Sequence, residues 1–116
     1  MLGLFAYIAQ MSSTSVNEVK EYTFEELCGI VAPIAESYKM KQVYLFGSRA
    51  RGDNRKDSDY DFCVVTSDDC DLFELGGFFA ELRDALGVEI DLVCQESLRD
   101  NFSREVLRDR RLVYEA

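Results

Sequence analysis

From about residue 23 onward, the sequence alternates between helical periodicity and short apolar runs of the kind that form strands. The segments with helical spacing are residues 23–39, 71–86 and 98–108, and the candidate strands are residues 43–46, 60–66, 88–93 and 112–114. Helices that alternate with strands pack as layers on a common sheet, and 116 residues suffice for one such core. The alternation therefore predicts an α/β (α+β) fold, with one small β-sheet flanked by helices.

Residues with strong local preferences set the expected ends of these helices. Thr23 followed by Glu26 has the spacing of a capping box, and Asp71 with Glu74 opens the second helix. Pro33 lies inside the first helix, where it lacks a backbone N–H donor and its ring crowds the preceding turn. We therefore expect this helix to be kinked or broken at Pro33.

The first 20 residues do not share this alternation. Residues 1–11 are apolar but have no basic start, and they are far shorter than the roughly 20 residues of a membrane-spanning helix. Residues 12–15 are polar and indicate a linker. We expect an N-terminal extension at residues 1–20 and one folded domain at residues 21–116, with no membrane association. The apolar segment is either a passive tail, a misassigned start, or a surface that docks on a partner or on a second copy of the chain in a homodimer.

Charge and residue content exclude several functions. With 13 Lys and Arg against 22 Asp and Glu, the formal net charge is −9, which argues against direct binding of nucleic acid. The sequence has no histidine, which excludes Ser-His-Asp and Cys-His nucleophile systems and a His-type zinc site. Its four cysteines form no C-x-x-C pair, and thiols within apolar runs are typical of proteins of the reducing cytoplasm.

A Gly-Ser pair follows the first candidate strand. Gly47 allows the backbone to approach a ligand closely, and Ser48 adds a hydroxyl donor. Free backbone N–H groups at such a turn can bind phosphate, and Arg49 and Arg51 can bring positive charge to it. A Gly-Ser pair alone is more often a plain turn, so its weight depends on the residues that accompany it.

Two aspartates stand at the start of the second strand. Asp59 and Asp61 are two residues apart, so on a strand they project to the same face. Paired carboxylates of this kind can share a divalent cation, and hard oxygen ligands favour Mg²⁺, which also takes phosphate oxygens from a substrate. The alternative is a pair of solvated carboxylates at a strand end. The strand itself has apolar side chains on both faces, which indicates an interior position in the sheet.

Asp91 lies in the middle of an otherwise apolar strand, residues 88–93. A carboxylate there is unfavourable unless it is paired, bound to a metal or near solvent. If this strand neighbours the preceding one, Asp91 reaches the face of Asp59 and Asp61, where three like charges repel one another until a divalent cation binds. Glu89 alternates onto the same face and competes for this role.

The spacing of these motifs resembles that of the minimal nucleotidyltransferases (MNT) of the DNA polymerase β superfamily. The signature of that family is Gly-Ser, ten residues and then Asp-x-Asp. The matching residues here are Gly47-Ser48, the ten residues 49–58, and Asp59-Tyr60-Asp61. The strand that contains Asp91 resembles the place of the family's third carboxylate, and the resemblance covers roughly residues 22–116.

The resemblance implies a polymerase-β-like core with a small mixed β-sheet, two Mg²⁺ ions and a nucleoside triphosphate substrate, usually ATP. The catalytic and metal-binding residues that it implies are Asp59, Asp61 and Asp91, and the nucleotide-binding residues are Gly47, Ser48 and Arg51. In the family pattern, Asp59 and Asp61 bind both ions, whereas Asp91 binds one ion and helps to deprotonate the attacking hydroxyl. These residue types suit in-line attack on the α-phosphorus, which needs cations at the attacking and leaving oxygens.

The chain spends nearly all of its length on this core, so we expect a partner to supply the surface for the acceptor. Stand-alone chains of this kind resemble the antitoxin of HEPN–MNT toxin–antitoxin pairs. That family implies transfer of AMP to a tyrosine of the HEPN toxin, which silences the toxin's RNase. Two alternatives stay open. One is a catalytically silent binding antitoxin or regulatory subunit, and the other is a small-molecule nucleotidyltransferase, for example one that modifies an antibiotic.

Overall fold

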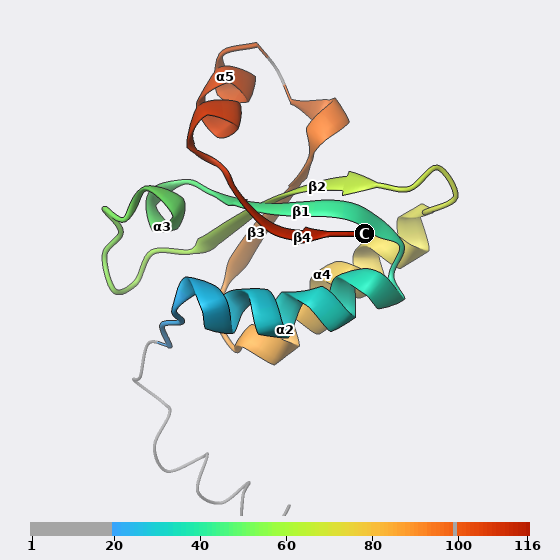
Figure 1. Ribbon diagram of the computed structural model, residues 1–116, viewed down its shortest axis with the longest axis horizontal. Coiled ribbons are helices and arrows are strands. Elements are labelled where there is room, and N and C mark those ends of the chain that lie inside the picture. Colours follow the sequence, from blue (N-terminus) through green and yellow to red (C-terminus); the bar gives the residue numbers. More distant parts are fainter. Residues whose placement is uncertain (1–19, 99) are drawn as a thin grey trace, which may run out of the picture.

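Four strands form the sheet on which the rest of the chain packs, in a computed structural model that describes residues 20–98 and 100–116 (Figure 1). The strands are β1 (Met40–Phe46), β2 (Tyr60–Thr66), β3 (Ile90–Cys94) and β4 (Arg111–Glu115). Their order is β3-β2-β1-β4, with β2 and β3 parallel and β1 antiparallel to both β2 and β4. The predicted mixed sheet is confirmed. The expected N-terminal extension lies, apart from residue 20, outside the described residues.

The strand ends follow local features of the chain. Strand β2 begins and ends at the predicted residues. Strand β1 begins three residues earlier than predicted, because the positive φ of Lys39, 64°, turns the chain directly into the sheet and the side chain of Met40 is buried there. Strand β3 begins two residues later than predicted, because Gly87 ends the preceding helix in a left-handed conformation and the turn that follows takes up residues 88 and 89.

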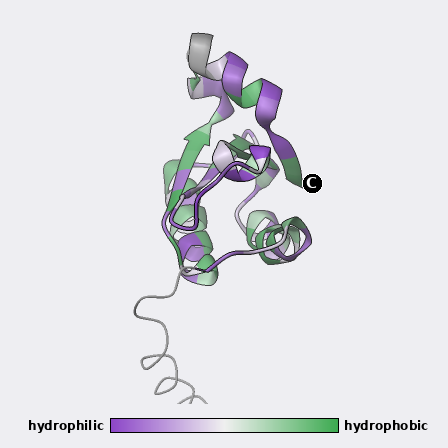
Figure 2. Cartoon of the chain, turned by 90° about the vertical axis from the view of Figure 1, so that its left-hand side faces the viewer, coloured by the Kyte–Doolittle hydropathy of each residue, from purple (hydrophilic) through white to green (hydrophobic). Residues whose placement is uncertain are grey.

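The helices lie on both faces of the sheet. The elements are α2 (Phe24–Ser37), α3 (Ser48–Arg51), α4 (Leu72–Leu86), the 3-10 helix η1 (Gln95–Ser97) and α5 (Asp100–Asp109). Helices α2 and α4 cover one face, and α5 lies over the other (Figure 1). Figure 2 shows α5 as largely hydrophilic, in keeping with a helix that packs through a few side chains only. No helix in the described residues has the length and apolar character needed to cross a membrane.

Both long helices begin at the predicted caps. The Thr23 hydroxyl accepts the backbone N–H of Glu26 at 3.0 Å, and the Glu26 carboxylate accepts the N–H of Thr23 at 2.9 Å. Asp71 and Glu74 make the same reciprocal pair, at 2.9 and 3.1 Å. Each capping box supplies acceptors for N–H groups that a helix leaves unpaired at its first turn.

A kink or a break was expected at Pro33, and the break is wrong, because helix α2 runs without interruption through this residue. The missing N–H of Pro33 would have bonded to the carbonyl of Gly29, one turn earlier. Both residues are exposed, so water can bind that carbonyl instead. The proline therefore removes one hydrogen bond on the solvent side of the helix and leaves its apolar side in contact with the core.

Alternation along β2 divides its side chains between the two faces of the sheet. Tyr60, Phe62 and Val64 are buried against α2 and α4, in the larger core. Cys63 points the other way and packs with Phe46 of β1 and Val106 of α5. The predicted interior strand, apolar on both faces, is confirmed.

Candidate active site

Asp61 and Asp91 are register partners on the parallel strands β2 and β3. Their neighbours Phe62 and Leu92 pack in the core on the side of α2 and α4. Because side chains alternate along a strand, the two carboxylates lie on the opposite face, which is the face of α5. The structure thus brings together two acidic residues that the sequence carries 30 positions apart.

Glu89 does not join this pair. It precedes β3, and its Oε2 lies 3.0 Å from Nη2 of Arg83 on α4, in an exposed ion pair. The structure therefore places Asp91, and not Glu89, directly opposite Asp61.

The environment of Asp61 disfavours its charged form. Burial and the neighbouring carboxylates of Asp91 and Asp59 together raise the pKa of Asp61 from 3.8 to about 6, with burial as the largest cause. The positive charge of Arg51 opposes this shift of the Asp61 pKa. Near neutral pH, the site holds adjacent negative charges that a bound cation would stabilise.

Gly47 lies at the point where β1 ends beside the start of β2. Phe46 pairs with Asp61 across the two strands, and the next residue, Gly47, has a φ of 77°. A Cβ atom at position 47 would stand 2.3 Å from Oδ2 of Asp61. Glycine is required here both for the positive φ and because the Asp61 carboxylate lies against the backbone.

A pocket of about 340 Å³ opens between this turn and α5. Gly47, Ser48, Arg51 and Asp61 line one side of it. The other side is formed by α5, which contributes Glu105, Val106 and Asp109. Its volume is at the small end of the range for ligand pockets in proteins. All three residues with an expected nucleotide-binding role therefore share one cavity with a carboxylate of the expected metal site.

Asp59 is on the loop that leads into β2, one residue before the strand begins. Its side chain is exposed, and it lines a second pocket of about 300 Å³ together with Ser58 and Glu89. Electrostatic repulsion from its carboxylate contributes to the raised pKa of Asp61. All three expected carboxylates consequently lie at one end of the β2–β3 pair.

The two arginines of the Gly-Ser turn have different environments. Arg51 lines the pocket, where its Nη1 lies 3.2 Å from Oδ2 of Asp109 and its Nε lies 3.1 Å from Oδ2 of Asp53. Arg49 points away, and its side chain is only 6% exposed. Arg51 therefore lies beside the Gly-Ser turn as expected. The expectation is wrong for Arg49, whose guanidinium bonds to backbone carbonyls.

The donor atoms at this site suit Mg²⁺. No three Cys, Asp or Glu side chains within residues 20–98 and 100–116 form a ready-made metal site. Mg²⁺ commonly binds through one or two carboxylates and completes its shell with water and substrate phosphates. The paired carboxylates of Asp61 and Asp91, with Asp59 close by, fit that mode, in which metal and nucleotide bind together.

Two features of the site are absent from the sequence-based prediction. Glu105 and Asp109 line the pocket from α5, which is far from the Gly-Ser turn in sequence. Their spacing of four residues places them on one side of a helix, but no local signal says which element that side faces. The prediction also lacks the contacts of Arg49, because their acceptors are backbone carbonyls, which no residue type in the sequence marks.

The fold and the paired carboxylates beside a Gly-Ser turn define a nucleotidyltransferase domain. Residues 30–116 match the family described as polymerase beta, nucleotidyltransferase. The chain belongs to this family, and it is a nucleotidyltransferase.

Relatives of the chain carry a more specific name. Protein adenylyltransferase MntA of Thermococcus cleftensis is 30% identical over 91 residues, which cover 75% of this chain and 92% of the relative. A Methanocaldococcus jannaschii protein that is named provisionally as a protein adenylyltransferase is 32% identical over 79 residues, or 66% of this chain and 78% of its own.

Solved structures show the same fold. A structure named as that of a minimal nucleotidyltransferase aligns with a TM-score of 0.68 and 28% identity, over 79% of this chain and 97% of the other. A toxin–antitoxin structure with AMP-PNP aligns with a TM-score of 0.64 and 23% identity, over 77% of this chain and 73% of the other. The complex of a tri-AMPylated HEPN toxin of Shewanella oneidensis with MNT antitoxin aligns with a TM-score of 0.61 and 20% identity. The alignment covers 81% of this chain and 74% of the other.

Proposed function

We propose that this protein transfers AMP from ATP to a hydroxyl group, and that the acceptor is a tyrosine of a HEPN-type toxin. The observation that carries the proposal is the pairing of Asp61 with Asp91 beside the turn that contains Gly47 and Ser48. The adenylyltransferase names of its relatives support AMP as the transferred group. The AMPylated HEPN toxin in a structural neighbour supports a toxin as the acceptor.

In this proposal, Asp59, Asp61 and Asp91 hold two Mg²⁺ ions. Bound Mg²⁺ would neutralise phosphate charge and stabilise the attacking and leaving oxygens of an in-line displacement. Oxygen atoms of Asp91 would accept the proton from the attacking hydroxyl. The exposure of Asp91 leaves its carboxylate accessible to an acceptor on another molecule.

The terminal phosphates of ATP would lie at the turn that follows β1. The hydroxyl of Ser48 and the backbone at Gly47 would hold them, and Arg51 would supply positive charge. The short distance between the Gly47 backbone and the Asp61 carboxylate would keep phosphate and metal ligands next to each other.

The acceptor surface is assigned to the partner protein. The described residues form the sheet, the helices that cover it and the site itself, which leaves no separate domain among them to bind an acceptor. The net charge of −9 disfavours a nucleic acid as the acceptor. The proposal places the nucleotidyltransferase domain at residues 21–116, which the family match over residues 30–116 supports. The four cysteines are unpaired thiols, which supports a cytoplasmic location.

The proposal is tested by mixing the purified chain with a candidate HEPN toxin, ATP and Mg²⁺, followed by mass spectrometry of the toxin. The expected result is a mass increase by AMP that maps to a tyrosine and does not occur when EDTA is present. Complex formation without any adduct would favour a silent binding antitoxin. Adducts on small hydroxyl compounds, with none on the toxin, would favour a small-molecule nucleotidyltransferase.

A further inference from the structure

We infer that Arg49 is a positioning residue, which fixes the loop between α3 and β2 so that Asp59 stands beside Asp61. The inference rests on the proposed function, because it concerns the placement of a proposed metal ligand. Arg49 is the second residue of α3 and follows Ser48 directly. It therefore links the proposed phosphate-binding turn to the loop that ends in the carboxylates.

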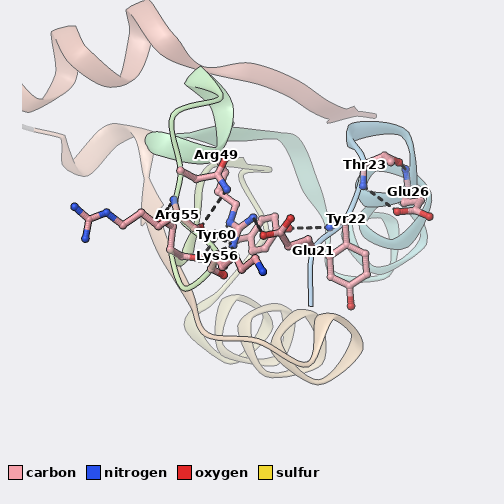
Figure 3. A network of polar contacts seen from close by, with 10 residues as sticks. Glu21, Tyr22, Thr23, Glu26, Arg49, Arg55, Lys56 and Tyr60 are labelled. Atoms are coloured by element: carbon pink, nitrogen blue, oxygen red, sulfur yellow. Dashed lines mark hydrogen bonds and ion pairs between the residues drawn. The ribbon is translucent and has the colours of Figure 1, made fainter. Parts of the chain in front are cut away.

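The guanidinium of Arg49 binds the end of this loop through backbone carbonyls. Its Nε and Nη2 donate to the carbonyl of Ser58 at 3.1 and 3.0 Å, and Nη2 also donates to the carbonyl of Lys56 at 3.1 Å. A longer contact of 3.4 Å joins Nη2 to the carbonyl of Arg55 (Figure 3). The carbonyl of Ser58, which accepts two of these hydrogen bonds, belongs to the peptide group that joins Ser58 to the proposed metal ligand Asp59.

Arg49 is itself held firmly. Its guanidinium carbon lies 4.2 Å from the centre of the Tyr60 ring, and Nη1 lies 3.9 Å from the carboxylate of Glu21. The hydroxyl of Tyr60 accepts the backbone N–H of Tyr22 at 3.0 Å, which ties the ring to the segment before α2 (Figure 3). Because the side chain of Arg49 is 6% exposed and its planar group is stacked on a buried ring, the guanidinium has little freedom to move.

Two contacts hold the start of the loop, where the backbone N–H of Asp53 donates to the carbonyl of Ser48 at 3.1 Å and the Asp53 carboxylate pairs with Arg51. Residues 53–58 are exposed or half-buried, and none of them belongs to either hydrophobic core. Within the loop, a short turn joins Arg55 and Ser58 through bonds of 2.8 and 3.1 Å. The turn stabilises the loop internally but does not attach it to the domain. At the end of the loop that precedes Asp59, the attachment comes from Arg49. A flexible Asp59 would bind a cation less well, because this part of the loop would have to be ordered first.

The test compares Arg49→Lys and Arg49→Ala with Arg55→Ala. Arg55 contributes its backbone but has an exposed side chain, so Arg55→Ala removes one positive charge from the same loop as a matched control. Lysine keeps the charge at position 49, but its single ammonium group cannot reproduce the planar fork of donors. The first measurement is calorimetric binding of AMP-PNP as a function of Mg²⁺ concentration. The second is hydrogen exchange of residues 53–59.

We expect Arg49→Lys and Arg49→Ala to raise the Mg²⁺ concentration for half-maximal AMP-PNP binding by about tenfold, since several bonds to a charged group are lost. Exchange over residues 53–59 should accelerate in both variants, with helices α2 and α4 unchanged. Added guanidinium ion at millimolar concentration should lower the Mg²⁺ concentration for half-maximal AMP-PNP binding in Arg49→Ala, partly back toward the wild-type value. Arg55→Ala should match the wild type.

An Mg²⁺ dependence of Arg49→Lys equal to that of the wild type would overturn the inference. A uniform loss of protection across the whole sheet, without rescue by guanidinium, would assign Arg49 a general structural role instead. If Arg49→Ala does not fold, Arg49→Lys decides alone. Failure of the wild type itself to bind AMP-PNP with Mg²⁺ would contradict the proposed function, which separates the two claims.

Discussion

Nη1 of Arg51 lies 3.2 Å from Oδ2 of Asp109, so the arginine that lines the pocket is already paired with a carboxylate of α5. The side chain of Asp109 is 11% exposed, and Nε of Arg108 binds its other oxygen at 3.1 Å. Both arginines lower the pKa of Asp109 and keep it charged. In the proposed reaction, a triphosphate would compete with Asp109 for Arg51.

The first prediction follows from this competition. Asp109→Asn should bind ATP a few-fold more tightly than the wild type, because Nη1 of Arg51 then loses its charged partner in the pocket and can pair with phosphate. Calorimetry with AMP-PNP and Mg²⁺ measures the effect. Asp53→Asn is the control, since Asp53 also pairs with Arg51 but does not line the pocket. Equal affinities of Asp109→Asn and wild type would show that the ion pair does not oppose nucleotide binding.

The second prediction concerns stability and pH. Because the pKa of Asp61 is about 6 in the folded protein and near 3.8 when unfolded, the folded state binds more protons between these values. Without metal, the contribution of Asp61 to stability should be present below pH 4 and lost as the pH rises through 6. Asp61→Asn should therefore stabilise the metal-free protein at pH 7, by about 1 kcal/mol after allowance for solvent screening at a half-buried group.

Denaturant unfolding in EDTA, at several pH values, measures this difference. The stabilisation by Asp61→Asn should shrink toward pH 4, and the variant should lose AMP transfer at every pH. A variant less stable than the wild type at pH 7 would contradict the raised pKa of Asp61 that burial and the neighbouring carboxylates produce.

The third prediction concerns Gly47. Gly47→Ala should lower the free energy of unfolding by about 2 kcal/mol or more, because its φ of 77° disfavours a side chain and the new Cβ would lie 2.3 Å from the Asp61 carboxylate. Gly29→Ala is the matched control. It lies in helix α2 with no atom within 4 Å of the new Cβ, and it should stabilise the protein by up to about 1 kcal/mol. Equal stabilities for the two variants would contradict the close approach of Asp61 to the turn.

The fourth prediction concerns Ser48, which lines the pocket. Ser48→Ala should fold normally and bind AMP-PNP about tenfold or more weakly, since a hydrogen bond to a charged group contributes roughly 1.5–3 kcal/mol. Calorimetry measures the dissociation constant, and thermal unfolding checks the fold. An unchanged constant would show that the Gly-Ser pair is only a turn.

The sequence was sufficient to predict the carboxylate pair. Period-two alternation puts a charged residue on a defined face of each strand, and an acid within an apolar strand indicates a partner. The prediction that Asp91 would reach Asp61 is confirmed by the register of β2 and β3. The positions of both capping boxes were also predictable, because they depend on residues only three apart.

Other contacts could not be predicted, because they join segments whose relative placement depends on the whole fold. Arg51 and Asp109 are 58 residues apart, and their contact requires the end of α5 to lie beside α3. The role of Arg49 escaped prediction for a different reason. Its sequence neighbours indicated phosphate binding, whereas its side chain faces the loop carbonyls and the ring of Tyr60. A positive residue near a Gly-Ser turn thus does not identify a phosphate ligand by itself.

The central claim is that the carboxylates beside the Gly-Ser turn support Mg²⁺-dependent AMP transfer, and Asp59→Ala tests it most directly. The variant should fold normally by circular dichroism, because the side chain is exposed and its removal reduces repulsion at Asp61. The measurement is Mg²⁺-dependent transfer of AMP from labelled ATP to a HEPN-type toxin, with Asp57→Ala as the control for a nearby exposed carboxylate on the same loop. We expect Asp57→Ala to be active and Asp59→Ala to be inactive. Full activity of Asp59→Ala would contradict the assignment of the metal site.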